Sequence, residues 1–340
     1  MLKKIYNNKP LIGLIVFSII VSFLNPRFLS VNNILNVLRQ TSINSVIAIG
    51  MTLVILTGGI DLSVGSILAL TGAFGASLIA NGVNPVLAIV IAIVIGGLFG
   101  IFNGLLISYA KLQPFIVTLV TMTLLRGATL VFTDGKPIPV RDGGDFFDNI
   151  GGGYFFDIPI PIYIMIALFI AGYYILNNIK FGRYIYAIGG NEEATKLSGV
   201  NTSKYKTLVY GVCGALSALA GVIVTSRLGS AQPTAGSGYE LDAIAAVVLG
   251  GTSLAGGVGT IAGTALGAII IGVLGNALNL LNVSSYYQMM VKALVILIAV
   301  LIDKNLLNKF YGWCNNYEKQ IKIFRTYGSC FRYGDNCWSC

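Results

Sequence analysis

Ten long apolar segments recur along this chain, and they restrict its fold more than any other feature. Most approach the ~20 residues that an α-helix needs to cross a bilayer. They fall at about 11–24, 42–58, 63–81, 85–109, 114–132, 159–177, 205–226, 241–257, 259–282 and 285–302. Backbone groups in lipid must satisfy one another, so the spans are expected to be helices. The pattern predicts an all-α polytopic membrane protein with about ten transmembrane helices.

The composition supports a bilayer as the solvent for this chain. Charged residues make up only 10% of the 340 residues and hydrophobic residues 55%, whereas soluble domains carry about 25% charged residues. We therefore expect one transmembrane domain over residues 1–303. Residues 304–340 are expected to form a cytoplasmic tail, weakly ordered because it is a chain end.

Two absences exclude several kinds of chemistry. The chain has no histidine, which excludes Ser-His triads and His-metal sites. It has no GxxxxGK[ST] loop, so binding and hydrolysis of ATP by this chain alone are not expected. The tail cysteines lack the two close pairs typical of a zinc site; they are Cys314, Cys330, Cys337 and Cys340. No catalytic, cofactor or metal site is predicted.

The distribution of positive charge predicts the orientation. With the N-terminus inside, fifteen of the 22 Lys and Arg residues fall on inner segments and five on outer loops, as the positive-inside rule requires. The N-terminal stretch MLKKIYNNKP is followed by no small-residue cleavage site, so the first apolar segment is expected to remain as an uncleaved helix. Both termini are predicted to be cytoplasmic.

The stretch TGGIDLSVGS places a carboxylate between two long apolar segments. One interpretation is local, because Asp61 or Ser63 can accept N–H bonds at the start of a helix. The other is a pathway or gate, because irregular backbone at membrane depth is tolerated only where it is buried in protein or wet. The candidate residues are Gly58, Gly59, Asp61 and Ser63.

The longest inner connection, KFGRYIYAIGGNEEATKLSGVNTSKYK, contains a predicted short helix. Asn191 is a suitable cap, Glu192 and Glu193 suit a first turn, and Gly199 suits the end. The segment is either a solvated connection or a docking element for a cytoplasmic partner. Its residues are Asn191, Glu192, Glu193, Ala194, Thr195, Lys196, Leu197 and Ser198.

The region from Ser226 to Gly257 combines an outer loop with an uncertain span. Arg227 and Gln232 face the outer water in this topology and are candidates for contact with an external partner. The glycine-rich stretch GGTSLAGGVGT leaves open whether residues 241–257 cross fully or re-enter. Arg126 and Lys292 lie within apolar segments, where basic side chains either snorkel outward or pair inside the bundle.

Four stretches carry a family resemblance: GMTLVILTGGIDLSVGSILALTGA, FGRYIYAIGGNEEATKLSGVN, SAQPTAGSGYELDAIAAVVLGGTSLAGG and SSYYQMMVKALVILIAVLID. They resemble the permease subunits of bacterial binding-protein-dependent monosaccharide ABC importers, those for ribose in particular. The similarity runs from about residue 9 to residue 303, and residues 304–340 have no recognised counterpart.

The resemblance implies the ABC importer permease fold and several partners. They are a second copy of the permease, a cytoplasmic ABC ATPase that binds ATP and Mg²⁺, and an extracytoplasmic sugar-binding protein. It also implies that the helix at 191–198 couples the permease to the ATPase, and that the chain lies in the bacterial inner membrane. No nucleic acid is expected as a partner.

The function implied is import of ribose or a similar monosaccharide, powered by a separate ATPase chain. An importer for another sugar or a furanose-like signal molecule is the main alternative. An ion-coupled secondary sugar transporter is a second, in which Asp61 would be the titrating acid. An intramembrane enzyme is a third, and no convincing catalytic constellation supports it.

Overall fold

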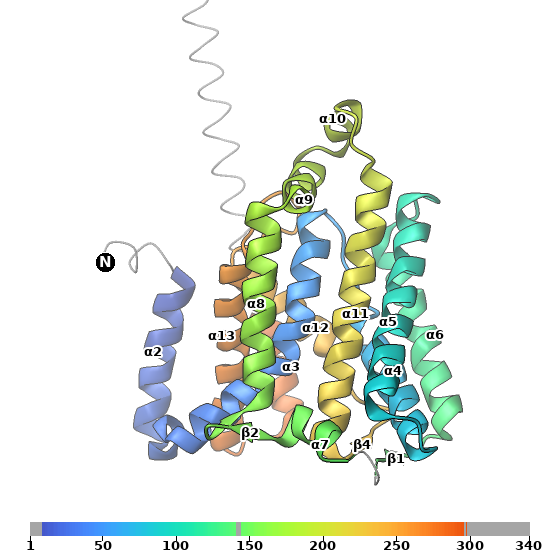
Figure 1. Cartoon of the computed structure of the whole chain (residues 1–340). Coiled ribbons are helices and arrows are strands. Elements are labelled where there is room, and N and C mark those ends of the chain that lie inside the picture. Colours follow the sequence, from blue (N-terminus) through green and yellow to red (C-terminus); the bar gives the residue numbers. More distant parts are fainter. Residues whose placement is uncertain (1–8, 141–143, 296, 298–340) are drawn as a thin grey trace, which may run out of the picture. The chain divides into compact units, whose positions relative to one another are not determined.

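Helices dominate the structure, and most of them run roughly along one direction (Figure 1). The computed structural model describes residues 9–140, 144–295 and 297 of the chain. The elements below belong to one unit, which extends to residue 296. A short helix, α10, projects at one end of this unit, which we call the α10 end. Helix α7 and the short strands lie at the other end, which we call the opposite end (Figure 1).

The first half of the chain forms five α-helices and a 3-10 turn. Proline begins three of these elements, at Pro26, Pro85 and Pro114, where its missing N–H costs no helical hydrogen bond. Asn25 and Asn84 cap two of the same elements. The elements are α2 Lys9–Leu24, η1 Pro26–Leu29, α3 Val31–Leu56, α4 Val64–Ala80, α5 Pro85–Ser108 and α6 Pro114–Thr133.

The second half adds seven labelled helices and four two-residue strands. Strands β1 and β4 pair antiparallel, as do β2 and β3. The elements are β1 Ile138–Pro139, α7 Gly144–Gly152, β2 Tyr154–Phe155, β3 Ile158–Pro159, α8 Ile160–Asn178, α9 Lys180–Gly190, α10 Glu192–Leu197, α11 Thr202–Leu228, β4 Ser230–Ala231, α12 Tyr239–Leu249 and α13 Ile261–Leu280. Residues 285–295 are also helical.

Six helices of the described part are long and apolar enough to cross a membrane, namely α3, α5, α6, α8, α11 and α13. Helix α4 is apolar but shorter. The prediction of a helical, multi-pass membrane protein is confirmed, whereas the predicted number of about ten spans is not.

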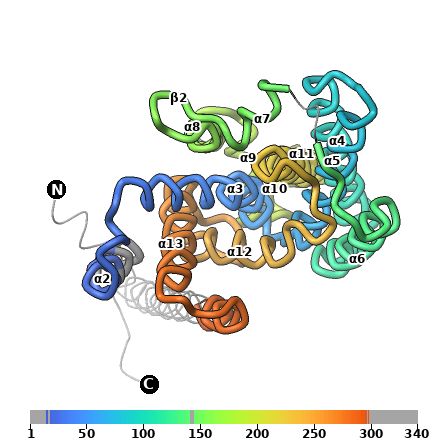
Figure 2. Tube along the Cα trace, turned by 90° about the horizontal axis from the view of Figure 1, so that it is seen from below, coloured from blue at the N-terminus to red at the C-terminus, as the bar shows by residue number. Residues whose placement is uncertain are grey.

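Helices α3 and α11 form the centre of the unit. In their most apolar windows 78% and 72% of the residues are buried, against 22% for α5 and 28% for α6 and α8. Viewed from below in Figure 2, α4, α5 and α6 lie on one side of this pair and α2 and α13 on the other. The outer helices leave apolar side chains exposed, which suits contact with lipid.

Small residues bring α5 and α11 into close contact. Gly96, Gly100 and Gly104 lie four residues apart on one face of α5, and a Cβ at any of them would collide with the backbone or Cβ atoms of α11. Small residues are the usual way for membrane helices to approach closely. The small residues of IGGLFGIFNG, residues 95–104, thus allow α5 to pack directly against α11.

The segment 241–257 is not one continuous helix. Helix α12 has 11 residues, about 16 Å at ~1.5 Å per residue, roughly half of the ~30 Å hydrocarbon core. Helix α12 ends at Leu249, just before Gly251 with φ at 85°. Residues 250–260 are irregular, and Gly256 and Gly257 also have positive φ. The predicted tail, residues 304–340, lies outside the described residues, so the expected division at residue 303 stays a prediction.

Candidate functional site

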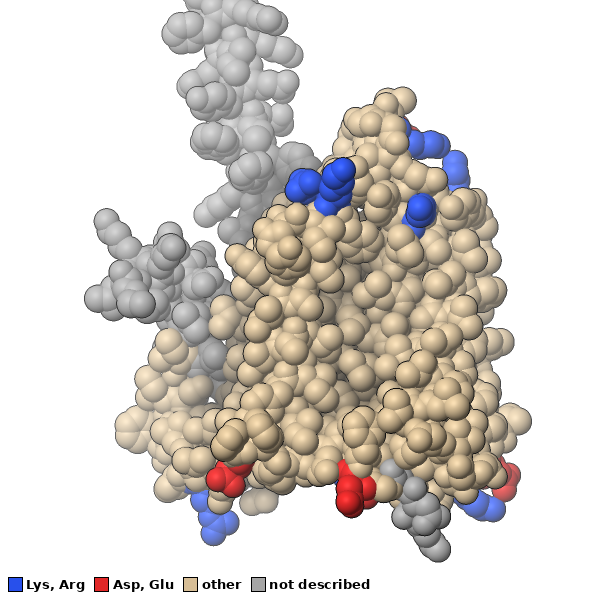
Figure 3. Space-filling model, in the orientation of Figure 1, with Lys and Arg blue, Asp and Glu red and all other residues tan. Residues whose placement is uncertain are grey.

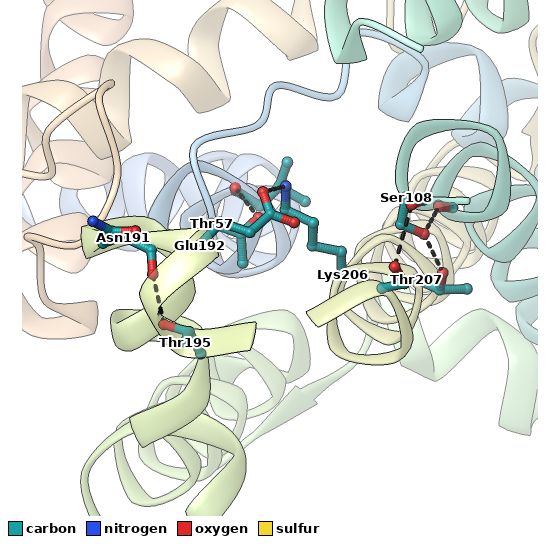
Figure 4. A network of polar contacts seen from close by, with 10 residues as sticks. Thr57, Ser108, Asn191, Glu192, Thr195, Lys206 and Thr207 are labelled. Atoms are coloured by element: carbon teal, nitrogen blue, oxygen red, sulfur yellow. Dashed lines mark hydrogen bonds and ion pairs between the residues drawn. The ribbon is translucent and has the colours of Figure 1, made fainter. Parts of the chain in front are cut away.

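Helix α10 is a six-residue helix that projects beyond the long helices (Figure 1). Asn191 caps it: its side-chain oxygen accepts the N–H of Ala194 at 2.9 Å. The hydroxyl of Thr195 donates to the Asn191 carbonyl at 2.7 Å (Figure 4). Gly199, with φ at 85°, follows the helix. The capped helix predicted at 191–198 is therefore present, with Glu192–Leu197 helical.

The two acidic residues of α10 have different surroundings. Glu192 pairs with Lys206 of α11 (Figure 4). Glu193 is exposed and forms no ion pair within the described chain. At the other end of the helix, Leu197 is 89% exposed. The projection thus offers a free carboxylate and an apolar side chain to a partner.

A groove of about 420 Å³ lies beside the projection. Glu192, Glu193 and Lys196 line it from α10, and Lys206 lines it from α11. The connection between α5 and α6 supplies further residues, including Lys111. This mixture of positive and negative side chains, open at the surface, suits contact with a charged protein surface better than with lipid.

The base of the projection is bonded to residues 250–260, and these residues are bonded to the end of α3. The hydroxyl of Tyr186 in α9 donates to the carbonyl of Gly259 at 2.8 Å, and burial raises the pKa of this phenol. Gly257 N–H donates to the Leu56 carbonyl at the end of α3 at 3.0 Å. A displacement of α10 and α9 would therefore act on α3 and on residues 250–260.

A hydroxyl pair joins α5 to α11 near the groove. Ser108 and Thr207 lie 2.8 Å apart, oxygen to oxygen (Figure 4). The Ser203 hydroxyl also donates to the Ser108 carbonyl at 3.2 Å. These bonds hold the start of α11 against α5. Lys206, which pairs with Glu192, lies in this part of α11, so the bonds also position one wall of the groove.

The predicted pathway or gate residues lie where α3 ends and α4 begins. Gly58 has φ at 76°, and a Cβ at Gly59 would collide with the Tyr210 hydroxyl. Asp61 is fully buried. Its Oδ1 accepts the N–H of Ser63 at 2.9 Å and the Ser63 hydroxyl at 2.6 Å. Asp61 therefore supports the turn into α4, while Ser63 makes no side-chain cap bond of its own.

The carboxylate belongs to a longer buried network. The Asn103 amide of α5 donates to the Ser63 hydroxyl at 2.9 Å. The Thr121 hydroxyl of α6 donates to the Asn103 oxygen at 2.7 Å. The network links the α3–α4 junction to two neighbouring helices, and its members are buried. It does not join the groove beside α10.

Arg227 and Gln232, the candidates for contact with an outer partner, lie away from α10. Arg227 is in the last turn of α11 and is half-buried. The Gln232 amide donates to the Ser230 hydroxyl at 3.0 Å, next to β4 at the opposite end.

Among the described residues no group of three or more Cys, Asp or Glu could hold a metal ion.

Residues 33–300 match the family described as the permease component of the branched-chain amino acid transport system. The chain belongs to this permease family. The match covers most of the described helices, so the permease is a transport subunit rather than an enzyme. No solved structure matches it.

Several curated relatives match most of the permease. It is 60% identical over 297 residues to the ribose import permease protein RbsC of Haemophilus influenzae, covering 87% of this chain and 92% of the relative. It is 58% identical over 295 residues to RbsC of Bacillus subtilis, with the same coverage of 87% and 92%. The D-allose transport system permease protein AlsC of Escherichia coli is 39% identical over 292 residues, covering 85% and 89%.

Two features of the site were missed by sequence reasoning. The Glu192–Lys206 pair joins residues fourteen apart in sequence across a bend, where no helical spacing signals a contact. The partners Asn103 and Thr121 of the Asp61 network lie in apolar helices whose sequences resemble any lipid-facing span. A polar residue within an apolar segment is the only signal that the sequence offered for them.

Proposed function

We propose that this permease is the transmembrane subunit of an ATP-driven importer that moves ribose, or a similar monosaccharide, into the cytoplasm. The observation that carries the proposal is the sequence identity of 58–60% to ribose import permeases over 87% of the chain. The α10 projection, with its free Glu193 and Leu197, supports a coupled ATPase partner. ATP and Mg²⁺ would bind that partner and not this chain.

The proposed orientation places α10 in the cytoplasm. On the face drawn in Figure 3, Lys and Arg gather at the α10 end, while Asp and Glu lie at the opposite end with a few basic residues. Positive charge on the inner side is the general rule for membrane proteins. The protein would lie in the bacterial inner membrane with both termini in the cytoplasm.

Three partners complete the proposed importer. Two copies of the permease form the membrane part, and an ABC ATPase docks on α10 and the groove beside it. An extracytoplasmic sugar-binding protein delivers the solute at the opposite end, where Arg227 and Gln232 lie. Binding of ATP would bias the permease between outward-open and inward-open states through different affinities for the two states.

The hydrogen bonds of the structure suggest a path by which movement of α10 reaches the junction between α3 and α4. The projection is bonded through Tyr186 to residues 250–260, and these are bonded to the end of α3. The Asp61 network lies just beyond that end, at Gly58, Gly59, Asp61 and Ser63. We propose that movement of α10 is transmitted to this junction, which acts as part of the gate.

A related sugar is the second candidate solute, because the D-allose permease AlsC is 39% identical over 85% of the chain. An ion-coupled transporter is disfavoured, since the relatives named above are components of import or transport systems.

The test is uptake by vesicles that contain the permease, its ATPase and its binding protein. We expect uptake of labelled ribose that needs ATP and is unaffected by a proton uncoupler. Uptake by the permease alone, driven by a pH or sodium gradient, would overturn the proposal.

A further inference from the structure

A polar cavity of about 320 Å³ lies between α3, α12, α13 and the helix at 285–295. It is separate from both the groove at α10 and the Asp61 network, with which it shares no lining residue. Its side chains include amides, hydroxyls and charged groups, which is unusual among helices with this many apolar residues. Polar groups inside a membrane domain are costly, and they commonly mark a solute or ion pathway.

The cavity extends from the opposite end, at Arg227 and Asn279, to the middle of the helices. Asn44, one of its lining residues, is the fourteenth of the 26 residues of α3. Helix α12 starts close to this depth, because Arg126, the thirteenth of the 20 residues of α6, donates to the carbonyls of Pro233 and Ala235 at 2.9 and 2.8 Å. These carbonyls lie just before α12, so a half-length helix begins inside the unit with its first turn beside the cavity.

An internal ion pair forms part of the wall. The Lys292 ammonium lies 2.8 Å from Oδ2 of Asp242, the fourth residue of α12. The Asn44 amide donates to the same oxygen at 3.3 Å. The pair neutralises both of these charges, so among the lining residues only Arg227 carries a charge that this pair does not balance. Its guanidinium group, like the amides and hydroxyls of the wall, can donate hydrogen bonds to hydroxyl groups.

Two further polar atoms of the wall lack partners among the described residues. The hydroxyl of Thr41, a residue only 3% exposed, makes no hydrogen bond, and neither does the side-chain oxygen of Asn44. Buried polar atoms are nearly always satisfied, and each exception in a native structure requires an explanation. Both residues line the cavity, so a bound molecule with hydroxyl groups would satisfy them.

We infer that this cavity is a solute-binding chamber for a single neutral polyhydroxyl molecule, held by the unpaired Thr41 and Asn44 oxygens and by the first turn of α12. The inference rests on the proposed import of a monosaccharide and adds the place where the sugar binds within the permease. A volume of about 320 Å³ is near the lower end of small-molecule pockets, roughly 300–1,000 Å³, which suits one monosaccharide.

Two glycines provide a matched test. Gly275 of α13 lines the cavity, and a Cβ built on it meets no atom within 4 Å, so a larger side chain would extend into open space. Gly127 of α6 also has no atom within 4 Å of an added Cβ, but it does not line the cavity. Gly275→Leu therefore adds a side chain to the cavity wall with no collision at its Cβ, and Gly127→Leu makes the same change outside the cavity.

We expect Gly275→Leu to lower ATP-dependent ribose uptake at least about tenfold in the assembled importer. A leucine side chain in the cavity would keep the sugar from the hydrogen-bonding groups of the wall, and the site would lose most of its affinity for the sugar. Gly127→Leu should transport like the wild type. Membrane abundance and recruitment of the ATPase are measured for both variants. Equal ribose uptake by the two variants, at equal abundance and recruitment, would overturn the inference.

A second pair of variants keeps the test decisive if Gly275→Leu does not assemble. Thr41→Val removes a hydroxyl that has no partner among the described residues, so it breaks no known internal bond. Thr71→Val, the control, removes a buried hydroxyl that donates to its own helix at Ile67, at 2.7 Å. We expect Thr41→Val alone to raise the ribose concentration for half-maximal uptake about three- to tenfold, the range of one net hydrogen bond.

The inference fails if Thr41→Val matches Thr71→Val in both rate and half-maximal concentration. Failure of the proposed function has a different signature, because the wild-type importer would then show no ATP-dependent ribose uptake. In that case the same variants are compared with labelled allose, the second candidate solute. An effect of Gly275→Leu on allose uptake would support the chamber, and its absence would refute it.

Discussion

Glu192 of α10 and Lys206 of α11 form an ion pair across the bend that carries the projection, whereas the adjacent Glu193 is left free within the described chain. The two neighbouring carboxylates, Glu192 and Glu193, are therefore expected to have different roles. Glu192 holds the projection against the longest helix of the unit. Glu193 is exposed and lines the groove beside the projection, where a partner protein can contact it.

The first prediction separates these tasks. Glu193→Lys should lower ATPase recruitment and ribose uptake together, because loss of a desolvated interfacial charge contact costs about 2–5 kcal/mol. Glu192→Gln should have a small effect, because partly exposed ion pairs contribute only about 0–1 kcal/mol. Co-purification of the tagged permease with its ATPase measures recruitment. Normal recruitment of Glu193→Lys would leave this carboxylate as a helix-end charge only.

The second prediction concerns Leu197. Its side chain is 89% exposed, so Leu197→Asp should leave the thermal stability of the permease within about 0.5 kcal/mol, as for most surface changes. If this side chain is buried against the ATPase, the same change should abolish co-purification. Leu197→Met, which keeps the apolar volume, serves as the control. Retained ATPase binding by Leu197→Asp would remove this residue from the interface.

The third prediction concerns the buried network at Asp61. Asn103→Leu removes the bond to the Ser63 hydroxyl and the acceptor for Thr121, so it should destabilise the permease by about 1–3 kcal/mol. Asp61→Asn keeps an acceptor for Ser63 and should cost less. Thermal unfolding in detergent gives the comparison. If Asp61→Asn is stable but does not transport, the carboxylate has a role in gating beyond the turn.

The fourth prediction concerns the C-terminal residues. The family match ends at residue 300, so removal of the residues after Leu307 should leave assembly and ribose uptake near normal. Membrane abundance of the shortened chain is measured beside its uptake. A shortened chain that is abundant yet inactive would assign a function to residues 308–340.

The sequence predicts some parts of this structure well because a local signal determines them. Apolar length alone predicts α5, α6 and α8, since a helix in lipid needs no other information. The Asn-Glu-Glu start of α10 predicts its cap, because capping depends on neighbours in the chain.

Other parts depend on contacts between distant residues. The glycine-rich stretch within residues 241–257 leaves a full span and a re-entrant segment open, and the structure, in which α12 packs against α3 and α13, has a half-length helix with an irregular continuation. Likewise, the partner of Lys292 is a residue fifty positions earlier, Asp242, and no spacing rule connects them. The cavity therefore had no counterpart in the sequence interpretation, although Lys292 was singled out there as a basic residue within an apolar segment.

The glycine face of α5 also bears on how the subunit can move. With Gly96, Gly100 and Gly104 seated on the backbone of α11, any sliding of one helix past the other would bring main-chain atoms into collision. The two helices are therefore expected to move together as one rigid body during a transport cycle. Bending is then expected in segments without such close contacts, and residues 250–260, which lie between the α10 end and the proposed chamber, are one such segment.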